Sequence, residues 1–195
     1  YDFQKTNKTT LKIETLSGVK TLFLNVENGK TQSVKVDMGA PSLSPEQIPV
    51  RLGGEAVVGR ETEIAGGRYA ITCVSMGNPH CVVFGGDPAE IEIEKLGPKF
   101  ETAALFPDRT NTEFVQVLGG NEIKMRVWER GSGETWACGT GACAAAVAAV
   151  LNGYAARDED IVVHLRGGDL TIRYTDETVF MTGAATTVFK GEIEI

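Results

Sequence analysis

The alternation of apolar and polar residues along the chain predicts a structure built mainly from short β-strands. Residues 9–15 alternate as a strand with one buried face does. Residues 21–26 and 31–36 flank an Asn-Gly pair at positions 28 and 29, which is typical of the turn of a β-hairpin. Residues 76–80 should form a loop between two strands. The remaining strands are expected at residues 68–74, 81–84, 112–118, 122–129, 161–165, 170–174 and 179–181.

Two segments have the spacing of helices. Residues 139–151 are apolar on almost every side, as in a helix enclosed by other elements, and the Asn-Gly pair that follows should end it. Residues 91–105 carry apolar side chains at helical spacing, with Pro107 just beyond the end. The pattern predicts an α/β (α+β) fold, in which a mixed, mostly antiparallel sheet wraps around one central hydrophobic helix.

Composition narrows the class of protein. A chain of 195 residues can form one large core or two small ones, and 42% of its residues are hydrophobic, without a run long enough to span a membrane. The net charge of −7 disfavours nucleic acid and anionic membranes as partners. None of the four cysteines forms a Cys-x-x-Cys pair. We therefore expect no metal site, and reduced thiols in the cytoplasm.

Residues 129–150 combine a glycine-rich turn, Cys138 and the start of the alanine-rich helix. Unpaired N–H groups at a helix start carry partial positive charge, which favours a thiolate and should lower the pKa of Cys138. Gly139 and Gly141 would let a carboxylate or phosphate approach the backbone. Taken alone, these residues leave a catalytic thiol and a structural cysteine equally open. Cys143, further along the helix, should pack in the core.

Three segments together resemble the diaminopimelate epimerase family, whose members interconvert the LL and meso forms of diaminopimelate without a cofactor. They are Met76–Cys81, Arg109–Phe114 and Glu129–Ala144, and the similarity extends to residues 181–185. Proline racemases and phenazine-biosynthesis isomerases share the architecture. They usually lack the Glu-Arg-Gly-x-Gly-Glu-Thr run that precedes Cys138 in this sequence.

The resemblance implies two pseudo-symmetric α/β domains, each a sheet around a helix, with the site in the cleft between them. We expect residues 1–37 to be a remnant of the N-terminal domain, residues 38–183 to form the C-terminal domain with the catalytic cysteine, and residues 184–195 to return to the first domain. The family's other catalytic cysteine stands in a Cys-Gly-Asn-Gly segment, which this sequence lacks. The chain is thus expected to be roughly the last two-thirds of such an enzyme, inactive alone.

The resemblance also implies roles for individual residues. Cys138 would be one of two acid/base thiols, with its protonation set by neighbouring groups. The implied catalytic residues are Cys138, His80 and Glu129. The implied substrate-binding residues are Asn78, Asn111, Glu129, Arg130, Gly139 and Thr140. Without the resemblance, His80 and the asparagines are more simply interpreted as turn residues, and Glu129 could equally be the exposed end of a strand.

The function implied is cofactor-independent epimerisation of LL-diaminopimelate to meso-diaminopimelate, in the synthesis of lysine and peptidoglycan precursors. No cofactor is expected, the partner is a small-molecule substrate, and the region of Phe189 would contribute to a homodimer. Two other functions stay open. One is a proline racemase-like isomerase, disfavoured by the context of Arg130 and Asn111. The other is a non-catalytic module that keeps only a carboxylate-binding pocket.

Overall fold

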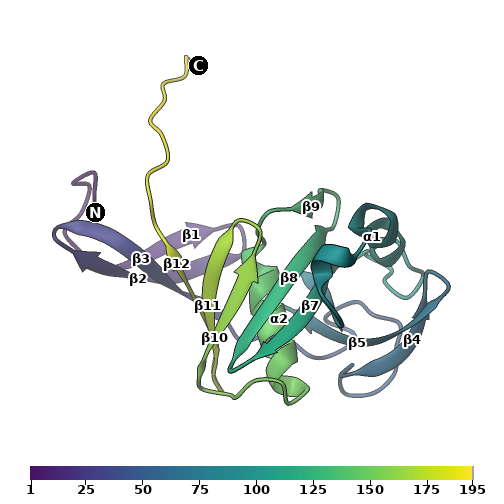
Figure 1. The fold of residues 1–195 in the computed structure, drawn as a ribbon. Coiled ribbons are helices and arrows are strands. Elements are labelled where there is room, and N and C mark those ends of the chain that lie inside the picture. The colour runs from purple at the N-terminus through teal and green to yellow at the C-terminus, as the bar shows by residue number, and fades with distance from the viewer. Residues whose placement is uncertain (195) are drawn as a thin grey trace.

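The computed structural model describes residues 1–194, which form one continuous 12-stranded sheet and few helices (Figure 1). The strand order is β1-β2-β3-β12-β11-β10-β8-β7-β6-β5-β4, and β9 pairs with β8 outside this path. The strands are β1 (Thr10–Thr15), β2 (Gly18–Glu27), β3 (Lys30–Gly39), β4 (Arg60–Ile64), β5 (Gly67–Ser75), β6 (Pro79–Phe84), β7 (Asn111–Gly119), β8 (Glu122–Glu129), β9 (Gly133–Thr135), β10 (Asp160–Leu165), β11 (Gly168–Tyr174) and β12 (Val179–Ala184). The helices are η1 (Pro88–Glu90), α1 (Ile93–Glu101) and α2 (Gly139–Leu151).

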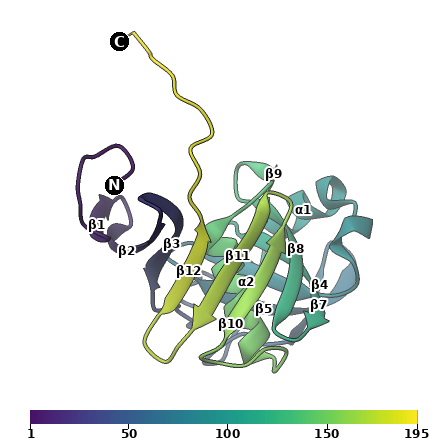
Figure 2. The ribbon, with the colours of Figure 1, turned by 60° about the vertical axis from the view of Figure 1, so that its left-hand side comes forward.

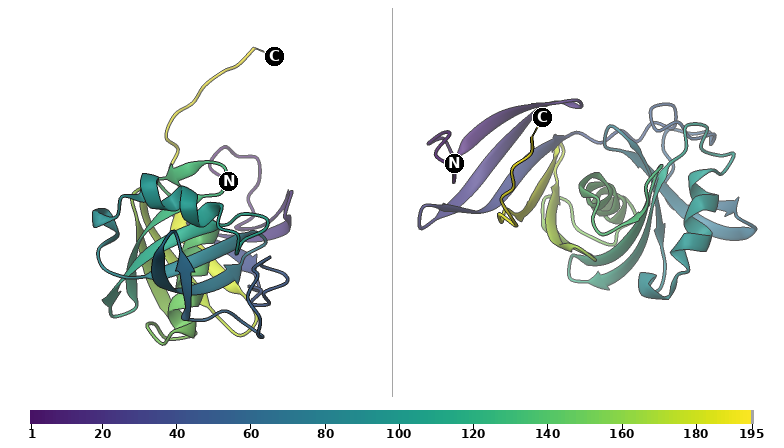
Figure 3. Two further views of the ribbon diagram at one scale, coloured as in Figure 1. Left: turned by 90° about the vertical axis from the view of Figure 1, so that its right-hand side faces the viewer. Right: turned by 90° about the horizontal axis from the view of Figure 1, so that it is seen from above.

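The sheet curls around α2, as the predicted fold class requires. Seen from above, the helix stands end-on inside a ring of strands (Figure 3). Most strand pairs are antiparallel, while β6 with β7 and β8 with β10 run parallel. Residues Ala142 to Ala149 are completely buried. Small side chains allow strands to approach the helix from all sides, and alanine is the strongest helix former, so this sequence suits an enclosed helix.

Strands β6 and β7 are buried on both faces, because a second hydrophobic core lies on the side of the sheet away from α2. Val82 and Val115 pack in the core around α2, whereas Cys81 and Phe114 pack in the core around α1. Side chains alternate along a strand. His80 and Glu113 lie two residues before Val82 and Val115, respectively, so both share the face that looks toward α2.

The chain's first three strands extend the sheet through an antiparallel ladder between β3 and β12 (Figure 2). Asn28 and Gly29 have positive φ angles of 50° and 75°, as a type I′ hairpin turn requires, and they join β2 to β3. This hairpin is therefore confirmed. The domain boundaries remain a prediction. Residues 185–194 form neither helix nor strand, and the last residue of the predicted tail, Ile195, lies outside the described residues.

Several predicted boundaries need correction. Helix α2 has the predicted bounds, but α1 covers only part of residues 91–105. It ends early because the Thr102 hydroxyl donates to the Pro98 carbonyl at 2.7 Å, and the next residues continue as turns. Strand β6 begins at Pro79, so His80 lies in a strand and not in the predicted loop. Strands β4 and β9 were not predicted, since their short sequences are mostly polar. Within the described residues, no helix is long and apolar enough to cross a membrane.

Candidate active site at the start of helix α2

Cys138 is the N-cap residue of α2, with extended backbone angles of φ −130° and ψ 111°. Its Sγ accepts a hydrogen bond from the Gly141 backbone N–H at 3.4 Å, which is the position that capping oxygens of Ser or Asp occupy in other helices. The Thr140 hydroxyl lies 3.5 Å from the same sulfur. The predicted helix-start cysteine is thus confirmed, and two groups that can donate hydrogen bonds converge on its sulfur.

A buried His–Glu pair lies on the sheet face beside this helix start. The parallel pairing of β6 and β7 places Val82 opposite Glu113, and His80 Nδ1 is 2.7 Å from Glu113 Oε1. Both side chains are completely buried. The carboxylate also lies against the first turn of α2, because a Cβ atom added to Gly141 would be only 2.7 Å from Glu113 Oε1. Glycine at this position lets the acid approach the thiol's helix.

A chain of hydrogen bonds links the pair to the sulfur. His80 Nε2 is 3.1 Å from the Asn78 amide oxygen, and the Asn78 amide nitrogen donates to Thr140 Oγ1 at 3.3 Å. An amide oxygen only accepts, so His80 Nε2 carries a hydrogen. Thr140 accepts from Asn78, and its own hydroxyl hydrogen is therefore free to point at Cys138. The direction of every bond leaves the sulfur as an acceptor, which suits a thiolate.

The pKa of Cys138 is nevertheless raised to about 11, so the sequence-based expectation of a lowered pKa is wrong. Burial is the largest cause, because it removes the water that would solvate a thiolate, and the Glu113 carboxylate adds to it. The bonds from Thr140 and Gly141 lower the pKa but do not compensate. At neutral pH this cysteine is a thiol. Burial likewise raises the pKa of Glu113, although His80 opposes the shift.

Asn111 holds two parts of the site together. Its amide nitrogen donates to the Pro79 carbonyl at 2.8 Å, and its amide oxygen accepts from the Arg130 backbone N–H at 2.9 Å. The start of β6 is thereby fixed to the turn that follows β8. The Arg130 guanidinium itself donates to the Asp108 carbonyl at 2.9 Å, and its side chain is exposed. Glu129 ends β8, half-buried, and accepts a short hydrogen bond from the Thr135 hydroxyl.

The structure therefore brings some of the predicted residues into direct contact and leaves others at the edge of the site. Hydrogen bonds connect Cys138 to Thr140, Thr140 to Asn78, and Asn78 to His80. Gly139 is the first residue of α2. Asn111, Arg130 and Glu129 lie on the adjoining ends of β7 and β8 and are linked to the others through β6. Glu113 belongs to the Arg109–Phe114 motif, but the sequence predicts no role for it. The signal that would have found it is an acid in phase with the buried valines of residues 112–118.

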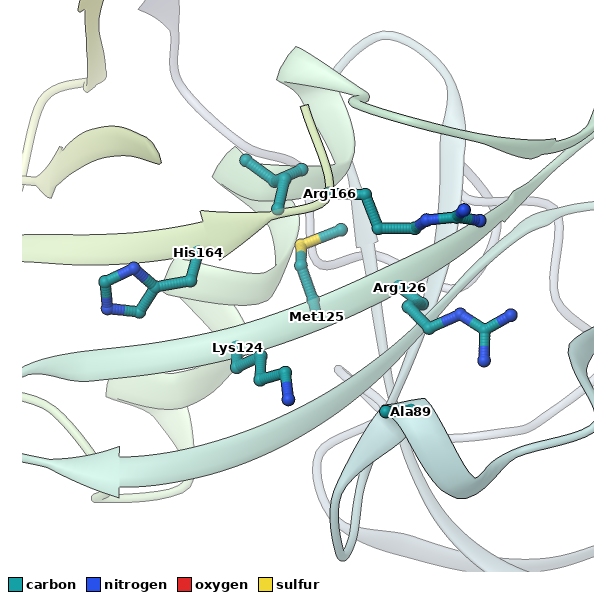
Figure 4. A pocket seen from close by; sticks show the side chains of 7 residues that line it. Ala89, Lys124, Met125, Arg126, His164 and Arg166 are labelled. Carbon is teal, nitrogen blue, oxygen red and sulfur yellow. The ribbon is translucent and has the colours of Figure 1, made fainter. Parts of the chain in front are cut away.

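A cavity of about 410 Å³ lies elsewhere, over β8 and β10 (Figure 4). The side chains of Lys124, Arg126 and Arg166 lie around it, together with His164. Each of these cationic groups is already paired with a carboxylate: Asp87 binds Lys124, and Glu134 binds both arginines. None of the predicted site residues lines this cavity. The hydrogen-bonded side chains of Cys138, Thr140, Asn78, His80 and Glu113 lie at the start of α2 instead.

Comparison with solved structures identifies the class of protein that has this fold. A probable proline racemase from Agrobacterium radiobacter K84 superposes with a TM-score of 0.71 at 14% identity, covering 98% of this chain and 62% of the racemase. A PhzF-family phenazine biosynthesis protein from Bacillus anthracis superposes with a TM-score of 0.60 at 16% identity, and the match covers 97% of this chain and 70% of the Bacillus protein. The fold is that of the racemases and epimerases of this structural group.

Sequence comparison then places the chain within the group. Residues 72–188 match the family model for diaminopimelate epimerase. The diaminopimelate epimerase of Agathobacter rectalis is 54% identical over the whole of this chain, and that of Methanococcus maripaludis is 51% identical. The chain belongs to the diaminopimelate epimerase family, a family of isomerases. It spans 71% and 70% of the lengths of these two relatives.

The four cysteines should differ in reactivity, and Cys138 should alkylate first. It is 7% exposed, whereas Cys73 is 1% exposed and Cys81 and Cys143 are completely buried. Burial also raises the pKa of Cys143 to about 12. Iodoacetamide treatment near neutral pH, followed by peptide mass spectrometry, should show Cys138 modified before the others, yet on the order of a hundredfold more slowly than a free cysteine, as its raised pKa requires. Equal labelling of all four would contradict this order.

Proposed function

We propose that this chain supplies one half of the catalytic site of a diaminopimelate epimerase, converting LL-diaminopimelate to meso-diaminopimelate without a cofactor. The observation that carries the proposal is Cys138 at the start of α2, with two hydrogen-bond donors directed at its sulfur. The diaminopimelate epimerases that share about half of its residues support the choice of substrate.

The reaction inverts one carbon, so a proton must leave one face of the α-carbon and another must arrive on the opposite face. A thiolate on one side takes the proton and becomes a thiol, and the electron pair stays on the α-carbon. A thiol on the other side then delivers its proton and becomes a thiolate. With its pKa near 11, Cys138 rests as the thiol and is the proton donor in one direction. In the reverse direction its thiolate accepts bonds from Thr140 and Gly141.

The α-proton is only weakly acidic, so the site must stabilise the developing negative charge. The N–H groups of Gly139 and Thr140 lie in the first turn of α2, where no helical acceptor is available to them. We assign the substrate's α-carboxylate to these groups, since anions bind at helix starts. Cys138 is in the same turn, which would place the sulfur close to the adjoining α-carbon.

The far end of the substrate would meet the polar groups around Asn111. The Arg130 guanidinium has the fork that binds a carboxylate, and within residues 1–194 it donates to the backbone carbonyl of Asp108. Asn78 and Asn111 offer neutral donors and acceptors, while Glu129 can accept from an ammonium group. His80 and Glu129 would set the protonation of the thiols. Lysine and peptidoglycan precursor synthesis, a cytoplasmic location and a homodimer involving Phe189 are part of this same proposal.

The two-thiol mechanism predicts that this chain alone does not epimerise diaminopimelate. The proposed partner of Cys138 is a cysteine in a preceding Cys-Gly-Asn-Gly segment, which is absent from residues 1–195. We expect an extended protein, in which such a segment precedes this chain, to turn over LL-diaminopimelate at least a hundredfold faster than the chain alone, the lower end of what one acid/base group contributes. Chiral chromatography of the product measures the turnover rates of the extended protein and of the chain alone.

The same assay separates the alternatives. Comparable turnover by the 195-residue chain would contradict the requirement for a second thiol. Epimerisation of proline but not of diaminopimelate by the extended protein would favour a proline racemase-like isomerase, to which the fold is similar. Binding of diaminopimelate by the extended protein without turnover would favour a carboxylate-binding module.

A further inference from the structure

The buried carboxyl group of Glu113 lowers the stability of the fold, so its presence needs an explanation. It is completely buried, only one of its oxygens is bonded to another side chain, and Oε2 has no hydrogen-bond partner among the described residues. A buried, incompletely bonded carboxylate costs several kcal/mol of stability. A valine at this position would match Val115 and the apolar face of β7. The acid is therefore better explained by what it does to its neighbours than by its contribution to stability.

The neighbours of Glu113 are the groups of the candidate site. Oε1 contacts His80, and the same oxygen lies against Gly141, whose N–H donates to the Cys138 sulfur. We propose that Glu113 is a positioning residue of this site, which orients His80 and keeps the Cys138 thiol protonated in the resting protein. The inference rests on the proposed function for its effect on catalysis, but its effect on the thiol can be measured separately.

Glu113 orients His80 through the hydrogen that the pair shares. His80 Nε2 must carry a hydrogen to donate to Asn78. With one further proton on the pair, either Nδ1 accepts from a protonated Glu113, or Nδ1 donates to an ionised Glu113. In both cases Nε2–H points at Asn78. The two arrangements differ only in which of the two residues holds the shared proton. The direction of the hydrogen-bond chain that ends at Cys138 depends on this proton.

Glu113 acts on Cys138 through its charge. When its carboxylate is ionised, the negative charge disfavours a second negative charge on the nearby thiol, where burial leaves little water to screen the repulsion. The other titratable groups near this region are Glu129 on β8 and Cys143 on α2, with Lys20 on β2 near Cys143 and Cys81 on the opposite face of β6. Glu129 also raises the pKa of Cys138, but by less than Glu113 does. Lys20 is the only cation among them, and it is linked to Cys143.

The charge on residue 113 can be removed while its size is kept. At pH 8, Cys138 of the 195-residue chain should be alkylated by iodoacetamide roughly tenfold faster in Glu113→Gln than in the wild type, since a pKa one unit lower means ten times more thiolate. Glu113→Asp retains the charge and should stay within about twofold of the wild type. Glu101→Gln removes another nearly buried carboxylate, bound to Trp128 and Gly131, and should leave Cys138 unaffected. Circular dichroism establishes that each variant is folded.

Each outcome decides for or against the proposal. An unchanged alkylation rate in folded Glu113→Gln would overturn it, as would equal acceleration in the Gln and Asp variants, which would indicate loosened packing. If the Gln variant does not fold, nitrogen–proton correlation NMR of the wild type decides, because a neutral His80 protonated only on Nδ1 contradicts the proposed orientation. In the extended protein, Glu113→Gln should shift the alkaline limb of the kcat profile to lower pH. Altered thiol reactivity in an inactive extended protein would refute the proposed function and leave this inference standing.

Discussion

Replacing Cys138 by Ser should abolish epimerisation by the extended protein, with a loss on the order of a thousandfold in kcat, the usual contribution of one acid/base group. A serine hydroxyl preserves the shape and the N-cap bond to Gly141, but its pKa is far above that of a thiol. It can therefore neither deliver the proton nor hold the charge that remains. The measurement is the rate of LL to meso conversion, followed by chiral chromatography.

Hydrogen exchange in deuterated water gives the matching control. The remaining thiol faces the other side of the α-carbon, so one stereoisomer should still exchange its α-hydrogen slowly, with retained configuration, while the other exchanges little. Cys143→Ser, a change in the same helix but away from its start, should retain the inversion in any variant that folds. Unchanged epimerisation by Cys138→Ser, or equal exchange from both stereoisomers, would show that Cys138 is structural.

Alkaline pH should destabilise this protein strongly. Burial raises the pKa of Cys138 to about 11 and that of Cys143 to about 12, and also raises the pKa of Cys81. In the unfolded chain a thiol ionises near pH 8.5, so above that value protons leave the unfolded state first and stability falls as pH rises. Below pH 8 these thiols have no effect. Between pH 9 and 11 we expect a loss on the order of 4 kcal/mol, measured by urea unfolding at several pH values.

A single substitution separates this effect from that of lysines and tyrosines, which also titrate at high pH. Cys143→Ala keeps a small residue in an alanine-rich helix and removes one buried thiol. At pH 7 it should be slightly less stable than the wild type, because a sulfur atom's packing is lost. Its stability should then fall less steeply toward pH 11. Parallel pH dependences for the two proteins would mean that Cys143 does not contribute to the alkaline loss.

Sequence reasoning succeeded where local patterns decide the structure. An Asn-Gly pair at positions 28 and 29 is compatible with few backbone conformations, and a run of alanines bounded by Cys138 and an Asn-Gly pair defines α2 at both ends. The end of α1 depended instead on a side-chain bond from Thr102. The short strands β4 and β9 are held by their neighbours in the sheet, and their own sequences carry little signal.

The sequence predicted which residues lie at the site, but not how burial and charge act on them. The position of Cys138 at a helix start follows from sequence, but its pKa does not, because burial and the charge of Glu113 arise only when β6 and β7 pack against α2. Periodicity in residues 112–118 does reveal that residue 113 faces inward. What no pattern in one chain gives is the partner, His80, which is 33 positions away along the sequence.

The enclosure of α2 also limits how this sequence can change over evolutionary time. A side chain enlarged anywhere from Ala142 to Ala149 has no solvent to expand into, and overpacking costs about 1–3 kcal/mol. Shrinking an alanine to glycine costs about 1 kcal/mol in helix propensity. Substitutions there are therefore confined to a narrow range of volumes, and single changes that are harmless on a surface helix would be removed by selection. Drift should accumulate in the outer strands and leave the helix that carries Cys138 nearly unaltered.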